Sequence, residues 1–137
     1  MTDMSCRTKS GLAILAIALA ACAQANVVLN GASEAPPVNT SASGSGAITV
    51  WTDGTLNGSI TTYGVAGTAA HLHTGAAGKN GPVAVPMVKN GDDGWSIPHG
   101  ARLTDAQFQS YKNGELYVNV HSAANKAGEI RGQLKPW

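Results

Sequence analysis

Hydrophobic and polar residues alternate through much of the chain, and this pattern predicts short β-strands. Residues 46–51 alternate in this way, and residues 116–121 read LYVNVH, in which every second side chain is apolar. A strand places successive side chains on opposite faces, so each such segment has one face for a core and one face for polar residues. The predicted strands cover residues 27–29, 46–51, 56–65, 69–74, 83–88, 116–121 and 130–134.

Turn residues separate these segments. Asp53-Gly54 is a strong hairpin signal between two predicted strands. Pro86 interrupts residues 83–88 and marks that segment as an edge strand or a bulge. Short strands at such close spacing predict an all-β fold, either an antiparallel β-sandwich or a partly closed barrel, of the Ig-like kind.

One short helix is expected near residues 105–112. Thr104 and Gln107 have the three-residue spacing of a capping box, in which each side chain bonds the backbone of the other. Gly114 supplies a stop, because glycine readily adopts the left-handed conformation that follows a helix end.

Residues 1–25 have the layout of a secretory signal peptide. Basic residues precede the apolar run GLAILAIALA at residues 11–20, and Ala23-Gln24-Ala25 forms a small-x-small cleavage site. The apolar run is about half the roughly 20 residues that a transmembrane helix needs, so no membrane span is predicted. Cleavage after Ala25 would leave residues 26–137 as one exported domain, periplasmic or extracellular.

Lipidation is an alternative to plain cleavage at the end of the predicted signal peptide. Residues 19–22 (LAAC) resemble a bacterial lipobox, whose cysteine would be lipidated and become the new N-terminus. A β pattern that begins by Val27 leaves almost no tether, which favours plain cleavage. The cysteines are Cys6 and Cys22, and cleavage after Ala25 removes both. The mature domain then has no thiolate, which excludes cysteine nucleophiles, zinc ribbons and iron–sulfur clusters.

Composition and charge exclude several function classes. Charged residues make up 12% of the chain, and removal of the first 25 residues leaves seven basic and seven acidic residues. A neutral surface predicts neither a nucleic-acid partner nor attraction to an anionic membrane. No Gly-x-Ser-x-Gly elbow supports nucleophilic catalysis. The glycine-rich residues 75–82 lack the Walker spacing and a following helix, so they are interpreted as a turn between strands.

Candidate chemistry centres on three histidines. His71 and His73 share one face of the predicted strand at 69–74, opposite Leu72. His121 lies with Tyr117 and Asn119 on the polar face of the strand at 116–121. If these strands are close, the three imidazoles form a trigonal or open tetrahedral ligand set for a transition metal. Copper is the first candidate and zinc the second. The alternative is three partly exposed histidines that form local hydrogen bonds.

Four other residues could contribute to such a site. Met87 could add a thioether ligand for Cu(I), but its apolar context VPMV favours a core position. His99 lies in a predicted loop that could approach the cluster. Glu129 and Arg131 lie beside His121 on the polar face of the last hairpin. They either orient that histidine or form a surface ion pair worth under about 1 kcal/mol.

Four segments of this sequence together resemble a known module. They are residues 29–38 (LNGASEAPPV), 70–83, 117–122 (YVNVHS) and 128–134 (GEIRGQL). In this order they resemble the CHRD domain, the module named after chordin, over nearly the whole chain after residue 25. The resemblance implies an exported β-sandwich-like domain. It also places the histidine positions of the family at His71, His73 and His121.

The resemblance also bears on function. In animals this module accompanies secreted antagonists of bone morphogenetic proteins, and in bacteria it is often a lone exported domain. The present chain lacks the cysteine-rich modules that bind growth factors in chordin, so growth-factor antagonism is not expected. Two functions are predicted: an exported protein that binds a transition metal, or a non-catalytic module that binds protein or matrix in the cell envelope or forms a homo-oligomer. An enzymatic role would need an open coordination position on the metal.

Overall fold

Strands make up about half of the structure, a computed structural model that describes residues 22–136 and the side chains of residues 24–136. The predicted hydrophobic run of the signal peptide lies outside these residues. Over the described range the elements are β1 (Cys22–Asn30), the 3₁₀ helix η1 (Gly31–Ser33), β2 (Ser43–Trp51), β3 (Leu56–Tyr63), β4 (Gly67–Thr74), β5 (Val83–Pro86), β6 (Val88–Asn90), β7 (Gly94–Ser96), α1 (Asp105–Lys112), β8 (Leu116–Ser122) and β9 (Ile130–Leu134).

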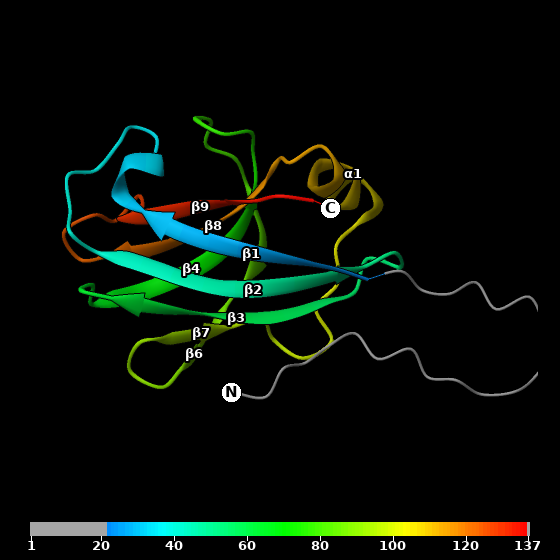
Figure 1. Cartoon of the computed structure of the whole chain (residues 1–137), viewed down its shortest axis with the longest axis horizontal. Helices are drawn as coiled ribbons and strands as arrows, with labels where there is room; N and C mark the ends of the chain where they lie inside the picture. The colour runs from blue at the N-terminus through cyan, green and yellow to red at the C-terminus, as the bar shows by residue number, and fades with distance from the viewer. Residues whose placement is uncertain (1–21, 137) are drawn as a thin grey trace, which may run out of the picture.

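The strands form one antiparallel sheet that curls into a nearly closed barrel (Figure 1). The strand order is β5-β4-β8-β9-β1-β2-β3-β7-β6. The strands at the two ends of this order, β5 and β6, are consecutive in the chain and are separated only by Met87. The backbone N–H of Met87 donates to Ala70 O of β4 over 2.9 Å. The chain therefore links the two edges of the sheet. Of the two predicted arrangements, the β-sandwich and the partly closed barrel, the structure has the barrel.

Alternating apolar side chains fill the barrel. Leu116, Val118 and Val120 of β8 are each 0% exposed and point inward, as the alternation predicted. Met87 is 7% exposed and belongs to the same hydrophobic core. Full burial of a side chain of this size contributes about 1.5–3 kcal/mol, so this inward face stabilises the barrel.

The first strand reaches back beyond the predicted cleavage site. β1 begins at Cys22, and Ala25 pairs with Ile48 of β2 and is 3% exposed. Cleavage after Ala25 would shorten β1 but would leave Val27 and Leu29 in the core. Cleavage at this position and lipidation of Cys22 both stay predictions.

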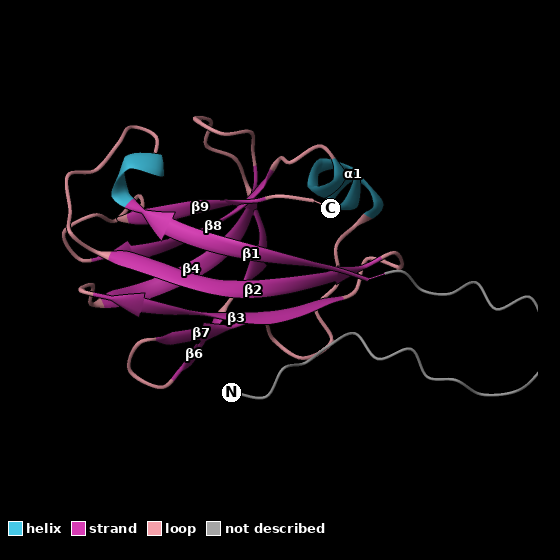
Figure 2. Ribbon diagram, viewed as in Figure 1, coloured by secondary structure: helices cyan, strands magenta, loops and turns pink. Residues whose placement is uncertain are grey.

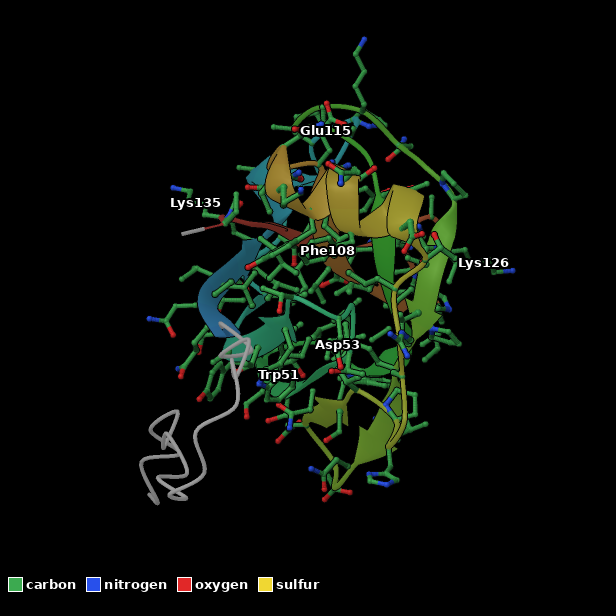
Figure 3. The ribbon with its side chains drawn as sticks, turned by 90° about the vertical axis from the view of Figure 1, so that its right-hand side faces the viewer. Trp51, Asp53, Phe108, Glu115, Lys126 and Lys135 are labelled. Carbon is green, nitrogen blue, oxygen red and sulfur yellow. The ribbon has the colours of Figure 1, made fainter. Side chains whose placement is uncertain are left out.

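The helix covers one end of the barrel, as Figure 2 shows from the side and Figure 3 from that end. α1 has the bounds expected from the sequence, and the capping box between Thr104 and Gln107 is present in both directions. Tyr111 is fully buried, and Phe108 packs against the core from the side of the helix that faces the strands (Figure 3). Both side chains therefore extend the hydrophobic core at this end of the barrel.

Two loops cover the outer face of β8 and β9. The loop that follows η1 and the glycine-rich loop at residues 75–82 lie on the same side of the barrel (Figure 1). The side chain of Asn80 joins them by donating to Ala35 O over 2.7 Å. The outward side chains of β8 and β9 are therefore covered rather than exposed, which determines the character of the site described next.

Candidate metal centre

Strand register brings the three candidate histidines together. β4 and β8 pair antiparallel, with His71 opposite Asn119, His73 opposite Tyr117, and Ala69 opposite His121. The three histidines and Asn119 therefore occupy four adjacent positions on the outward face of two neighbouring strands. The sequence predicted this meeting only on the condition that the two strands lie close, and the structure fulfils that condition.

The histidine ring nitrogens are close enough to surround one ion. One ligand atom from each of His71, His73 and His121 can be chosen so that all lie within 4.8 Å of one another. His71 Nδ1 lies 2.9 Å from His121 Nε2. A zinc–nitrogen bond is about 2.0–2.1 Å long, so the nitrogens of a tetrahedral site lie about 3.3 Å apart. Shifts of about 1 Å would bring the three rings into coordinating positions.

Backbone carbonyls determine which nitrogen carries the lone pair in two of these rings. His73 Nδ1 lies 2.9 Å from Gly81 O, and His121 Nδ1 lies 2.7 Å from Lys126 O. A carbonyl only accepts, so in each ring Nδ1 carries the proton and Nε2 carries the lone pair. A carbonyl that holds the other ring nitrogen is the usual support of a metal-binding histidine.

Burial keeps two of the imidazoles neutral. Burial lowers the pKa of His71, and the neighbouring His121 and His73 lower it further. Burial likewise lowers the pKa of His73, whose exposed fraction is 8%. Because the neutral ring is the form that binds a metal, both rings stay available as ligands below the usual histidine pKa of 6.5.

Tyr117 holds the His73 ring in position. The two rings are stacked with their centroids 4.9 Å apart and an interplanar angle of 3°. The Tyr117 hydroxyl accepts a hydrogen bond of 3.1 Å from Gly81 N–H. Because Gly81 O accepts from His73, the tyrosine, the glycine backbone and the histidine form one connected unit. Tyr117 was predicted to share this face, but its contact with His73 was not.

Arg131 has a different environment from the one expected. It is 1% exposed, its guanidinium lies 3.4 Å from the centroid of the Tyr117 ring, and its Nη2 donates to Ala76 O over 2.9 Å. The predicted surface ion pair with Glu129 is wrong, because both side chains are covered by loops and bind other groups. Arg131 instead fastens the 75–82 loop, which carries Gly81, to the sheet.

Glu34 is a buried carboxylate that the sequence analysis missed. It lies just after η1, is 5% exposed, and has no hydrogen-bond partner at Oε1. Burial raises its pKa, while the nearby Arg131 charge and the Asn119 amide act in the opposite direction. No periodicity marks a loop residue, so the strand pattern carried no signal for this position, although it lies in the segment at 29–38 that resembles the CHRD domain.

Glu129 stabilises the loop after β8. Its carboxylate accepts hydrogen bonds from Thr40 Oγ1 (2.9 Å), Ser122 Oγ (2.7 Å) and Asn125 Nδ2 (3.2 Å). The Ser122 bond above all holds the pKa of Glu129 below 4.5. A carboxylate of lowered pKa stabilises the fold above the unfolded-state pKa, and this stabilisation is lost as pH falls through the folded-state pKa.

We therefore predict a pH-dependent effect of Glu129→Gln. The variant should lose about 1 kcal/mol of unfolding free energy at pH 7, because a neutral amide accepts these bonds less strongly than a carboxylate. The difference from the unmodified protein should shrink below about pH 4.5, the unfolded value. Urea unfolding at pH 7 and at pH 3.5 measures it. Glu115→Gln, at an exposed position, is the matched control; equal losses in both variants would contradict the prediction.

Two other residues considered as ligands lie elsewhere. Met87 is part of the hydrophobic core inside the barrel. His99 is exposed in the loop after β7 and is not part of the group formed by His71, His73 and His121. A cleft of about 740 Å³ lies between residues 32–37 and the 75–82 loop, and the histidines do not line it.

Comparison with known families agrees with this architecture. The family model described as the CHRD domain matches residues 25–134. The chain belongs to the CHRD domain family. The match spans the barrel from β1 to β9 and includes the three histidines of this CHRD domain. Neither the comparison with curated proteins nor that with solved structures gives a match.

Within the described residues of this CHRD domain, no helix is long and apolar enough to span a membrane.

Proposed function

We propose that this CHRD domain binds one transition-metal ion through His71, His73 and His121, with copper preferred to zinc. The observation that carries the proposal is the pair of carbonyl-held rings, in which Nε2 of His73 and of His121 carries the lone pair. His121 Nε2 accepts from His71 Nδ1 over 2.9 Å, a contact that a bound metal would replace. His73 Nε2 is buried and has no hydrogen-bond partner. A buried lone pair without a donor costs about 1–3 kcal/mol, and a bound cation would remove that cost.

The preference for copper rests on ligand type and place of action. Imidazole nitrogen suits copper and zinc alike, and copper binds more tightly than zinc at a given nitrogen site. The N-terminal sequence predicts export, and an exported copper site would serve storage, delivery or tolerance of the metal in the cell envelope. The intact mass of the exported protein reports whether the chain starts at Asn26 or at an acylated Cys22.

Metal titration tests the proposal directly. The exported protein, purified without a polyhistidine tag and stripped with a chelator, is titrated with Cu(I), Cu(II) and Zn(II). We expect one copper ion per chain and weaker binding of zinc. His99→Ala should leave the stoichiometry unchanged, because His99 lies outside the cluster. Binding no tighter than that of isolated surface histidines would contradict the proposal and leave a protein- or matrix-binding module as the function.

A further inference from the structure

A fourth side chain faces the same point as the histidines. On the outward face of β4 and β8, Asn119 lies directly across from His71 and two residues before His121 on the same strand. It lies on the diagonal from His73, and the His73 and Asn119 side chains interact. Asn119 is 3% exposed. It is therefore enclosed by the three histidines on one side.

The orientation of the Asn119 amide follows from its other neighbours. Its Nδ2 lies 3.4 Å from Ala127 O. The same end of the amide faces the Glu34 carboxylate. The backbone of Gly128 confirms this proximity, because a Cβ added there would lie 2.6 Å from Asn119 Nδ2 and would collide with Glu34 Oε1. Both neighbours of Nδ2 are acceptors, so the amide nitrogen belongs there and the amide oxygen belongs on the histidine side.

Two buried acceptor atoms, His73 Nε2 and Asn119 Oδ1, consequently lie on the histidine side of Asn119 with no donor between them. His73 Nε2 carries a lone pair because Nδ1 donates to Gly81 O, and Asn119 Oδ1 is an amide oxygen. Both atoms are buried, and no donor bonds to either of them. The two side chains contact each other, but two acceptors cannot form a hydrogen bond. Acceptors are left in such an arrangement when a cation or a water completes it, because unpaired buried polar atoms are costly.

We infer that Asn119 Oδ1 is the fourth ligand of the metal site, which makes the site a closed three-nitrogen, one-oxygen environment for a divalent ion. This inference rests on the proposed function. An amide oxygen is a hard ligand, which suits Cu(II) or Zn(II) better than the soft ion Cu(I). Four protein ligands leave no open position at a tetrahedral ion, which is typical of sites that hold a metal rather than catalyse a reaction.

Selective loss of divalent binding is the expected signature. Asn119→Ala, in the full exported protein, should weaken Cu(II) and Zn(II) binding by at least about tenfold and leave Cu(I) affinity within about threefold. The electron paramagnetic resonance spectrum of bound Cu(II) should change, since an oxygen donor is lost. Asn119→Asp should restore divalent binding because it returns an oxygen to the same position. Asn57→Ala, at an exposed position on β3, is the matched control.

The outcomes separate the inference from the proposed function. If the unmodified protein binds no copper or zinc, the proposed function and this inference both fail. If it binds and Asn119→Ala leaves affinity and spectrum unchanged, only the inference fails. Equal weakening of Cu(I) and Cu(II) would mean that Asn119 merely supports the fold, and it would overturn the inference. If Asn119→Ala does not fold, Asn119→Asp decides: divalent binding at or above the unmodified level supports the inference, and weaker binding overturns it.

Discussion

Replacement of His121 by alanine should reduce copper affinity by at least about 100-fold, and replacement of His71 should do the same. Loss of even an outer partner of a metal ligand costs roughly 10- to 100-fold in affinity, and here a ligand itself is removed. His121 and His71 are only partly buried, so their loss should leave the barrel folded. The measurement is competition of each variant against a copper chelator of known affinity.

Stability gives a second measure of the same effect. A metal that binds only the folded state raises the free energy of unfolding by about 2.7 kcal/mol at a free concentration 100 times Kd. We expect this gain for the unmodified protein and for His99→Ala, and we expect at most about 0.4 kcal/mol for His71→Ala or His121→Ala at the same copper concentration. Unchanged copper affinity in His121→Ala would show that this ligand set is wrong.

The pH dependence of binding follows from the lowered pKa values of His71 and His73. Protons compete with the metal only where the rings become charged, and burial moves that range below 6.5 for both residues. Proton competition at His71 and His73 should therefore be weak from pH 8 to about pH 6.5 and should grow at lower pH. An NMR titration of these two rings in the metal-free protein measures this, and protonation of either ring well above pH 6.5 would contradict their neutral, buried state.

The second large effect is expected for Arg131. Arg131→Met should lower the free energy of unfolding by about 3 kcal/mol, because removal of a buried charged group strands its partners. The groups that lose a donor are Ala76 O at 2.9 Å, Gln133 Oε1 at 3.0 Å and Asn80 Oδ1 at 3.4 Å, and the stacking on Tyr117 is lost as well. Denaturant unfolding of the metal-free protein measures the loss.

Arg131 should also affect the metal site from a distance. It fastens the loop that carries Gly81, and Gly81 O holds the His73 ring. Under conditions where Arg131→Met is fully folded, copper affinity should fall by about 10- to 100-fold, the usual cost of losing the support of a ligand. Arg102→Met is the matched control, because Arg102 is exposed, and it should change stability by less than about 0.5 kcal/mol. Similar stability of the two variants would contradict the assigned role of Arg131.

Local features of the chain were sufficient to predict several elements. The capping box gave the bounds of α1, the Asp53-Gly54 turn gave the β2–β3 hairpin, and alternation gave the inward face of β8. Each of these features depends on residues close together in the sequence, so the local residue pattern is sufficient to predict it. The three-residue strand β7 was not predicted, because its sequence GWS is too short to show any period.

The sequence by itself determined that His71 and His73 share one face of a strand and that His121 lies on the polar face of another. The tertiary structure alone decided that these strands are neighbours, since β4 pairs with β8 more than 40 residues later in the chain. It also decided that loops bury Arg131, Asn119 and Glu34 on the outer face. Strand periodicity reports the face on which a side chain lies. Which strands pair, and which loop covers that face, depends on packing between distant segments, and no local pattern records it.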